Sequence, residues 1–411
     1  MSDGPTRIMV VDDNLAMATT AKVLLENAGF HVTLCDSSIR ALEEIPSERP
    51  DCVLLDILMP EMDGLEVCRR LRARQELADL KIVMFTAKAF AYDQARAVEL
   101  GADGYIVKPI DPETFADEVT RLIEDKIEIK FWGVRGTLPR PGKDTLCYGG
   151  NTPCVTLGIA NEPLIVLDAG TGIKNLSNSL MASGKQRIQG KLMISHPHWD
   201  HINSLPFFAP LYVPGNDFEI IGADQSGVTV HDFVTAQMDG VYFPITTREF
   251  GARVEFRDLR EGSYKIAGLD LETLLLSHPG NCLGYRFNRG GRSICYVTDN
   301  ELFLPDSPYF SQEYEDRLST FVEGADALIT DVTYTDEEYP KFVGYGHSCV
   351  SQVAALAARA QVQTLCLFHH DPDQNDDDID RKLASTREAL VKHGGESVNC
   401  IAPAEGDEIS I

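Results

Sequence analysis

At 411 residues the chain is too long for one ordinary hydrophobic core, so we expect two domains. With 44% hydrophobic and 24% charged residues and a formal net charge of −26, it is typical of a soluble globular protein, and the charge argues against binding to bulk nucleic acid. No apolar run is long enough to span a membrane, the first residues lack a signal-peptide pattern, and the ten cysteines form no CxxC pair, so we predict a reduced, cytoplasmic protein without membrane contact.

The first 125 residues alternate short apolar runs with amphipathic stretches. Five runs predict strands: RIMVVDD, HVTLCD, CVLLDI, KIVMFTA and GYIVKPI. Apolar residues at helical spacing predict five helices, at Ala16–Ala28, Ile39–Ile45, Gly64–Arg74, Lys88–Leu100 and Pro112–Asp125. Five βα units imply an α/β fold with a doubly wound parallel sheet, whose functional groups gather at the C-terminal ends of the strands.

Polar residues stand at these predicted strand ends. Asp12 and Asp13 end the first strand, and Asp56 ends the third. Thr86 ends the fourth strand and Lys108 the fifth. Three carboxylates need a divalent cation in order to lie together, and oxygen ligands alone suit Mg²⁺. Taken alone, Asp56 could be an ordinary helix-capping or strand-end acid, but five positions in register argue against that alternative.

In these residues the segment 5–125 resembles the receiver domain of two-component response regulators. The resemblance implies that Asp56 accepts a phosphoryl group from a sensor histidine kinase or a phosphotransfer protein. It implies that the acidic pair and Asp56 bind Mg²⁺, and that Thr86 and Lys108 contact the phosphoryl oxygens. Tyr105 matches the aromatic switch residue of that family.

The last predicted helix of this region runs directly into IEIKFWGVRG, which predicts a new strand. We therefore place the first domain at residues 1–126 and the second at residues 127–411. The near absence of a linker predicts a stiff joint, which suits domains that influence each other mechanically. In the second domain, strands alternate with glycine- and proline-rich loops, and two late helices are predicted at Val350–Ala360 and Ile379–Lys392.

Between Lys191 and His201 the chain reads KLMISHPHWDH, an apolar strand that ends in a dense group of metal-ligand residues. His196 and His198, two apart on an extended segment, can share one metal, and Asp200 and His201 can face a second. The alternative, a solvated polar loop, leaves these four residues without a purpose. An open two-metal site generates a hydroxide nucleophile at neutral pH, so the motif predicts a metal-dependent hydrolase.

Three later apolar runs also end in ligand-type residues: LETLLLSH at His278, SICYVTD at Asp299 and QTLCLFH at His369. Asp299 could bridge two metals. The predicted ligands are His196, His198 and His278 for one metal and Asp200, His201 and His369 for the other. His370 is the alternative to His369, because adjacent residues on a strand point to opposite faces and only one of them faces the metal.

Residues 127–411 resemble the metallo-β-lactamase-fold hydrolases, and in particular the phosphodiesterase branch that includes ribonuclease Z. HPHWDH fits the HxHxDH signature of that family. The resemblance implies an αββα sandwich with two Zn²⁺ ions, or Mn²⁺ or Fe²⁺, at the edge between its sheets. It implies that Asp168 in VLDAG supports the metal-binding loop and that Asp200 is needed for catalysis. It also implies that His347 protonates the leaving oxygen and that Asp331 orients His347; capping of the helix at Val350 is the alternative for His347.

Two further features give weaker hypotheses. Arg135, Arg140 and Lys143 lie in a glycine- and proline-rich stretch and are candidates for binding substrate charge, with ordinary surface positions as the alternative. Residues 217–261 stand where ribonuclease Z carries a basic arm that grips transfer RNA. Because this segment is mixed and acidic, we expect it to wall a substrate cleft or form an oligomer contact instead.

The sequence thus predicts a phosphorylation-regulated response regulator whose output is a dinuclear-metal phosphodiesterase acting on a nucleotide or another small phosphodiester. A lactonase or thioesterase is the first alternative, because the same site can attack carbon or phosphorus. A non-catalytic signalling protein that uses the fold for binding is the second. A di-iron reductase is disfavoured, because that branch usually has glutamate at the position of His198. Phosphorylation of Asp56 is expected to act through the joint or through a homodimer.

Overall fold

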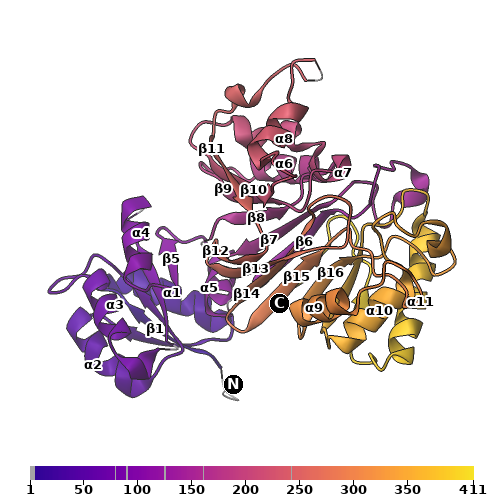
Figure 1. The fold of residues 1–411 in the computed structure, drawn as a ribbon. Coiled ribbons are helices and arrows are strands. Elements are labelled where there is room, and N and C mark those ends of the chain that lie inside the picture. The colour runs from indigo at the N-terminus through magenta and orange to yellow at the C-terminus, as the bar shows by residue number, and fades with distance from the viewer. Residues whose placement is uncertain (1–4, 79, 89–90, 125, 161, 242) are drawn as a thin grey trace. The chain divides into compact units, whose positions relative to one another are not determined.

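The computed structural model describes the whole chain except residues 1–4, 79, 89–90, 125, 161 and 242 (Figure 1). The chain divides into two compact units; apart from residues 159–161, the first unit ends at Lys126 and the second begins at Ile127. Within the described residues, no helix is long and apolar enough to cross a membrane.

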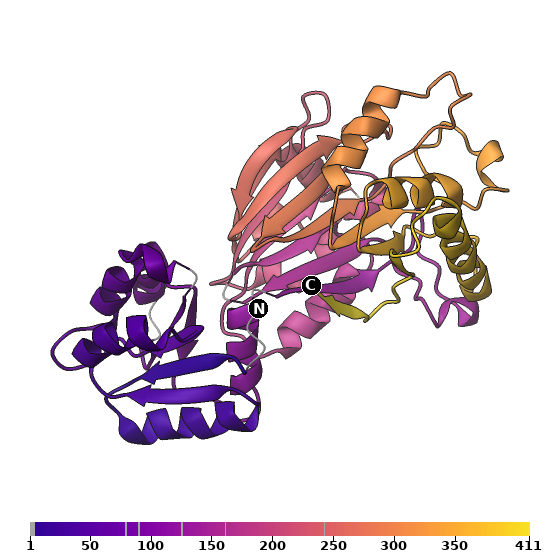
Figure 2. The same cartoon turned by 90° about the horizontal axis from the view of Figure 1, so that it is seen from below.

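The first unit, indigo to purple in Figure 2, contains a sheet and helices. The sheet has five parallel strands in the order β2-β1-β3-β4-β5. Its strands are β1 Arg7–Val11, β2 His31–Cys35, β3 Cys52–Leu55, β4 Lys81–Thr86 and β5 Gly104–Val107. Its helices are α1 Leu15–Asn27, α2 Ser38–Glu48, α3 Gly64–Arg72, α4 Ala91–Glu99 and α5 Phe115–Glu124, with a 3₁₀ turn at Gln75–Leu77. This sheet confirms the predicted doubly wound fold. Part of the predicted helix at 88–100 and residue 125 of the last one lie outside the described residues.

Both faces of this sheet are buried, which explains why its strands read as continuous apolar runs. Ile8 and Val10 of β1 contribute to the core formed with α1 and α5. Met9 and Val11 contribute to the core formed with α2, α3 and α4. Because the helices pack on the two faces of the sheet, the C-terminal strand ends stay uncovered and can carry polar groups.

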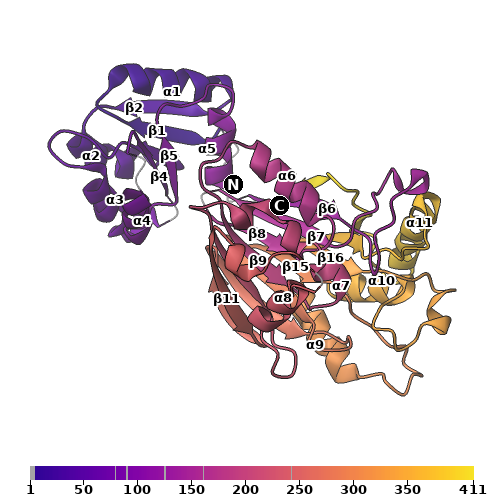
Figure 3. The ribbon, with the colours of Figure 1, turned by 90° about the horizontal axis from the view of Figure 1, so that it is seen from above.

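The second unit is built on two seven-stranded sheets (Figure 3). The first sheet has the order β11-β10-β9-β8-β7-β6-β19, with β6 Ile127–Gly133, β7 Cys154–Ile159, β8 Leu164–Leu167, β9 Gln189–Ile194, β10 Asp217–Ala223, β11 Arg253–Leu259 and β19 Glu408–Ser410. The second runs from β12 to β18 in sequence order, with β12 Gly262–Ile266, β13 Leu269–Leu275, β14 Leu283–Arg289, β15 Arg292–Val297, β16 Ala327–Asp331, β17 Thr364–Phe368 and β18 Asn399–Ile401. Residues 217–261 therefore supply the outermost strands of the first sheet.

Helices cover the outer faces of both sheets, which confirms the predicted αββα sandwich. The first sheet packs against α6 Ile173–Ala182 and α8 Val230–Gln237, and α7 Trp199–Ile202 follows β9. The second packs against α9 Gln312–Val322, α10 Val350–Arg359 and α11 Asp376–Lys392. Short 3₁₀ turns occur at Lys143–Thr145, Leu205–Phe207, Ala209–Tyr212, Thr247–Glu249 and Tyr339–Lys341. Of these helices, α10 and α11 were predicted from the sequence, and α6, α8 and α9 were not.

Side chains of the second sheet reach across to the first near the ends of the strands. The hydroxyl of Tyr285 on β14 donates to the carbonyl oxygen of Ile194 on β9, at 2.7 Å. The hydroxyl of Tyr296 on β15 donates to Asp168, just after β8, at 2.8 Å. These bonds join the two sheets at the edge where the predicted ligands gather.

Candidate metal centre

Seven side chains predicted as metal ligands lie together in the second unit, although they follow strands of both sheets. Within each of three groups, the candidate ligand atoms all lie within 4.8 Å of one another. The groups are His196, His198, His278 and Asp299; Asp200, His201 and His369; and Asp299, His347 and His369. The first two groups have the members of the two predicted metal sites, and Asp299 stands with the first.

Asp299 presents one carboxylate oxygen to each side of the cluster. Its Oδ1 lies 3.2 Å from both His201 Nε2 and His369 Nε2. Its Oδ2 lies 3.5 Å from His196 Nε2 and 3.7 Å from His278 Nε2. A carboxylate placed in this way can bridge two metal ions.

In two of the rings that face this carboxylate, the other ring nitrogen is engaged in a hydrogen bond. His201 Nδ1 donates to Asp168 Oδ2 at 2.7 Å, and His278 Nδ1 donates to the carbonyl oxygen of Gly346 at 2.9 Å. In a neutral imidazole, donation from Nδ1 leaves Nε2 as an acceptor. Among the described residues, the buried Nε2 atoms of His196 and His201 have no hydrogen-bond partner. Because lone pairs and carboxylates repel each other unless a cation lies between them, this donor set fits divalent metal ions.

Burial and mutual charge set the protonation of the cluster. Burial holds the pKa of His196 well below its ordinary value, and the neighbouring His201 lowers it further. For Asp200, burial acts to raise the pKa, but His201 and His369 outweigh it and hold the pKa well below its ordinary value. A neutral histidine and an ionised aspartate are the forms that metal ligands require.

Asp168 is fully buried beside the metal-binding loop. Its Oδ1 accepts a hydrogen bond from the backbone N–H of Ser195 at 2.7 Å. Its Oδ2 accepts from the hydroxyl of Ser195 at 2.9 Å and from Tyr296 at 2.8 Å, as well as from His201. These bonds fix the orientation of His201 and the start of the loop that carries the ligands, as expected for a supporting carboxylate.

The backbone is strained where the strands deliver their ligands. The angle φ is +60° at Asp168, +34° at Asp299 and +57° at His369, in the left-handed region that such residues rarely adopt. Each such residue costs about 1 kcal/mol or more. Gly136 makes room for the site, because a Cβ there would lie 2.2 Å from ring atoms of His369. Surrounding contacts thus hold the ligands in place against local strain.

His347, which is partly buried, pairs with fully buried Asp331 next to these ligands. His347 Nδ1 donates to Asp331 Oδ2 at 2.7 Å, and the His347 ring stacks on His369 with 4.9 Å between centroids. Burial lowers the pKa of His347, but Asp331 outweighs it and raises the pKa to about 9. Asp331 also accepts from the N–H and hydroxyl of Thr333 at 2.8 and 2.6 Å. The N-cap of α10 is Cys349, so the structure does not use His347 as a cap.

The hypothesis that Arg135 binds substrate charge is wrong. Its side chain is fully buried, so the surface alternative is wrong as well. Its Nε donates to the carbonyl oxygen of Gly149 at 3.0 Å, and Nη1 donates to those of Gln374 and Asp371. Arg135 therefore joins loops under the site. Arg140 also donates to a backbone carbonyl of this region.

Two fully buried residues extend this polar interior. Lys382 on α11 donates to the carbonyl oxygens of Val332 and Thr333, at 2.6 and 3.2 Å, and to a side-chain amide oxygen. Burial lowers the pKa of Lys382 to about 7. His370 belongs to none of the groups above, and its ring nitrogens have no hydrogen-bond partner among the described residues. Of the adjacent pair, it is His369 whose Nε2 faces the carboxylates.

Sequence reasoning missed Glu301, which is buried two residues after Asp299. Its carboxylate accepts the backbone N–H groups of Gly344 and Gly346, both at 2.7 Å, and the hydroxyl of Tyr339 at 2.9 Å. Gly346 in turn accepts from His278, and a Cβ at Gly346 would lie 2.3 Å from the His278 ring. Glu301 therefore fixes the loop that carries both this glycine and His347. An acid directly after a ligand-bearing strand is the only sequence signal for it.

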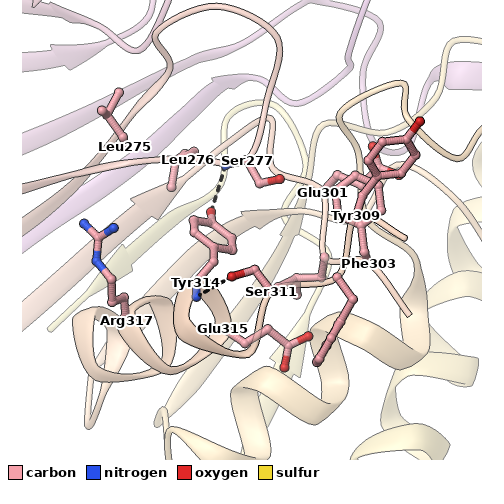
Figure 4. Close-up of a pocket in the computed structure, with 12 residues that line it drawn as sticks. Leu275, Leu276, Ser277, Glu301, Phe303, Tyr309, Ser311, Tyr314, Glu315 and Arg317 are labelled. Carbon is pink, nitrogen blue, oxygen red and sulfur yellow. Dashed lines mark hydrogen bonds between the residues drawn. The ribbon is translucent and has the colours of Figure 1, made fainter. Parts of the chain in front are cut away.

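A cavity of about 330 Å³ adjoins these loops (Figure 4). Ser277 and Glu301 line it on one side, and Phe303, Tyr309 and Tyr314 contribute rings. The backbone N–H of Ser277 donates to the Tyr314 hydroxyl at 2.9 Å, which closes part of its wall. Its lining contains none of the metal-ligand side chains, so the cavity is separate from the cluster.

The receiver-like unit carries a second acidic cluster. Candidate ligand atoms of Asp12, Asp13 and Asp56 lie within 4.8 Å of one another. Lys108 Nζ lies 2.7 Å from Asp12 Oδ2 and 3.1 Å from Asp56 Oδ2. Burial raises the pKa of Asp12 although Lys108 opposes it. Oxygen ligands with one exposed member, Asp13, suit a hydrated Mg²⁺ ion.

The other two predicted receiver residues contact the segment after β4. Thr86 is fully buried, and its hydroxyl oxygen accepts from the N–H of Lys88 at 3.4 Å. The hydroxyl of Tyr105 donates to the carbonyl oxygen of Lys88 at 2.8 Å. Both side chains therefore contact the backbone of Lys88 in the short segment after β4.

Known proteins resemble the two parts of the chain separately. Residues 8–120 match the response regulator receiver domain, and residues 164–370 match the beta-lactamase superfamily domain. The response regulator MprA of Mycobacterium sp. (strain KMS) is 38% identical over 119 residues, which are 29% of this chain and 51% of that protein. The chain thus covers about half the length of such relatives.

Two solved structures are similar to the second unit. One is the metallo-beta-lactamase fold protein YhfI from Bacillus subtilis, with a TM-score of 0.49 and 16% identity over 70% of this chain and 100% of that one. The other is a diphosphatase from the PhnP family, with a TM-score of 0.48 and 15% identity over 70% of this chain and 97% of that one. Both likenesses concern the fold.

Proposed function

Since the chain belongs to the beta-lactamase superfamily and carries a response regulator receiver domain, we propose that it is a response regulator whose output is a dinuclear-metal phosphodiesterase. The proposed substrate is a nucleotide or another small phosphodiester. The proposed metals of the second unit are two Zn²⁺ ions, or Mn²⁺ or Fe²⁺, and the receiver takes Mg²⁺. A sensor histidine kinase or phosphotransfer protein would phosphorylate Asp56.

The observation that carries the proposal is the position of Asp299 between two groups of histidines. Its two oxygens face different groups, at 3.2 Å on one side and at 3.5 and 3.7 Å on the other. His196, His198 and His278 would hold one metal, and Asp200, His201 and His369 the other. When bound, two divalent ions at this position supply Lewis-acid activation of water and of a phosphoryl oxygen.

The chain's own groups complete the reaction. The backbone N–H of Thr137 donates to Asp200 Oδ2 at 2.8 Å and so holds this carboxylate toward the cluster. Because His347 Nδ1 is bonded to Asp331, the transferable proton of His347 is on Nε2. With a pKa of about 9, His347 carries that proton at neutral pH and can deliver it to the departing alkoxide. Asp331 keeps the ring oriented and stabilises its charged form.

Phosphorylation is proposed to change the rate of this reaction. Asp56 lies in the acidic cluster of the first unit, with Lys108 beside it. A phosphoryl group there adds negative charge at a site that already contains three carboxylates, so it must redistribute the contacts of Lys108 and Mg²⁺. The test compares turnover of the full chain with and without beryllofluoride, and Asp56→Asn should abolish the difference.

The proposal is tested by assaying the full chain on bis(4-nitrophenyl) phosphate and on a panel of linear and cyclic nucleotides. About two metal ions per chain are expected by elemental analysis. Asp200→Ala should lose metal and turnover together. Asp306→Ala, at an exposed aspartate outside the cluster, is the matched control and should keep both.

Three outcomes would contradict the proposal. Full turnover by Asp200→Ala would separate the reaction from the cluster. Turnover of lactones or thioesters without turnover of any diester would make the protein a carbon-centred hydrolase. Bound metal without turnover on any class of substrate would make the second unit a binding module.

A further inference from the structure

A row of aromatic side chains leads from His347 toward the surface of the second unit. The ring of Tyr334 lies edge-on to His347 at 6.1 Å between centroids. Phe342 stacks on Tyr334 at 4.6 Å, and Tyr345 packs on Phe342 at 5.6 Å. We call Tyr334, Phe342 and Tyr345 the aromatic row. It begins in the interior, where Tyr334 is buried, and ends in solvent, where Tyr345 is 63% exposed.

The loop of residues 342–347 holds this row at a fixed place beside the cluster. The carbonyl oxygen of Gly346 accepts a hydrogen bond from His278 Nδ1 at 2.9 Å. The N–H groups of Gly344 and Gly346 donate to buried Glu301, both at 2.7 Å. Tyr345 stands between these two glycines, so its backbone is anchored on both sides. The row is therefore a preorganised surface.

The exposed end of the row is apolar. Tyr345 and Val343 are both large apolar side chains open to solvent, at 63% and 42% exposure, on one short loop. Single exposed apolar residues are common, but Tyr345 also continues the stack of Phe342 on buried Tyr334, so it presents an aromatic ring face that a ligand can contact. Lys341 directly precedes the row and is exposed, so it offers a charged alternative on the same loop.

From these contacts we infer that the aromatic row is the leaving-group subsite and that it takes a planar aromatic ring. This inference rests on the proposed function, in which His347 protonates the leaving oxygen. The group bonded to that oxygen must then lie beside His347, and the side chains that continue from His347 are aromatic. A flat ring can stack on Tyr345 at the open end, whereas a chain of phosphates gains nothing from such a surface.

Inhibition of the metal-loaded full chain by analogues of the leaving group tests the planar requirement. The substrate is methyl 4-nitrophenyl phosphate, whose only ring is on its leaving group. We expect 2-naphthol to inhibit competitively and its saturated counterpart, decahydro-2-naphthol, to inhibit at least about threefold more weakly, because only the flat ring can stack.

Substitutions on the loop test the residues. Tyr345→Ala should raise KM and weaken naphthol inhibition by about three- to tenfold with little change in kcat or metal content, because one stacking partner is lost. Tyr345→Phe should keep wild-type values because it keeps the ring. Lys341→Ala is the matched exposed control and should also stay at wild-type values.

Direct binding of 2-naphthol, followed by its fluorescence, separates the two proposals. If wild-type protein turns over no diester, the proposed function fails and the leaving-group assignment fails with it, and naphthol binding that Tyr345→Ala weakens then shows only that Tyr345 binds aromatic rings. If diesters are turned over but Tyr345→Ala changes neither KM nor naphthol affinity, the subsite fails and the proposed function stands. A larger effect of Lys341→Ala than of Tyr345→Ala would show that charge selects the leaving group and would overturn the inference.

Discussion

The two acidic clusters of this chain both hold carboxylates close together, but their negative charge is balanced in different ways. In the first unit, Lys108 lies within 3.1 Å of both Asp12 and Asp56, so the chain itself supplies a cation. In the second unit, the buried carboxylates of Asp200 and Asp299 face histidine ring nitrogens, which carry a positive charge only when they are protonated. The first cluster therefore has a counter-charge without any metal, whereas the second needs metal ions or protons to balance its charge.

This difference has a functional meaning. A receiver must admit a phosphoryl donor and later release the phosphoryl group, so a loosely held Mg²⁺ ion with an internal lysine as substitute suits it. A hydrolase site must keep its metals through many turnovers, and Asp168 with its buried hydrogen bonds keeps the ligand His201 in one orientation. The contrast predicts that the second unit, but not the first, depends on bound metal for its stability.

The largest expected effect is that of metal removal. A chelator strong enough to remove the metal ions of the second unit should abolish turnover and lower the unfolding midpoint of that unit. Metal ions at a free concentration of about a thousand times their dissociation constant stabilise the folded state by about 4 kcal/mol. The unfolding midpoint of the first unit should change little, because Lys108 remains in place. Calorimetry of the full chain with and without chelator measures both. Equal shifts in both units would remove the contrast.

The second largest effect is expected from a substitution of His347, which should impair proton transfer but not metal binding. His347→Gln should lower turnover of diesters with an alkyl leaving group by about 10²- to 10⁴-fold, because their oxygen must be protonated as it leaves. Turnover of 4-nitrophenyl esters, whose leaving group is stable as an anion, should fall far less, and metal content should stay at the wild-type level. Equal losses on both substrates would assign His347 to the metal site instead.

The ligand positions could be predicted because both units obey one rule. Each apolar strand that ends in Asp or His is visible in a single sequence, and the ends of parallel strands meet at one edge. Asp56 in the first unit and Asp299 in the second were found in this way. The sharing of Asp299 between two groups was suggested by its position but required the geometry of both sheets.

The same reasoning could not predict which charged side chains are buried. Charge predicts exposure, yet Arg135 is fully buried, and its acceptor Gln374 lies 239 residues away along the chain. Lys382 lies at helical spacing from the buried residues Ile379 and Thr386 of α11, but the carbonyl oxygens that it contacts belong to the segment after β16. Local pattern cannot tell which loops converge on a buried group.

A smaller effect is expected when the internal cation of the first unit is removed. Lys108→Met leaves the buried carboxylate of Asp12 without its partner, which should destabilise the first unit by about 2–3 kcal/mol in the absence of divalent ions. Mg²⁺ should restore most of this loss, so the variant becomes metal-dependent as the second unit is. Lys22→Met, at a half-exposed lysine outside the cluster, is the control. A variant as stable as wild type without Mg²⁺ would contradict the counter-charge assigned to Lys108.

The smallest expected effect concerns Lys382. This lysine donates to carbonyl oxygens, whereas Lys108 donates to carboxylates. Burial lowers the pKa of Lys382 to about 7, below that of an unfolded lysine, so the unfolded chain binds more protons above that pH. Its contribution to stability therefore rises with pH, by about 1–2 kcal/mol from about pH 7 to about pH 9. Lys382→Met should lose this slope, and urea unfolding of the metal-loaded second unit at several pH values measures it. Parallel pH profiles for wild type and variant would mean that Lys382 keeps its proton in the interior, balanced by its hydrogen bonds alone.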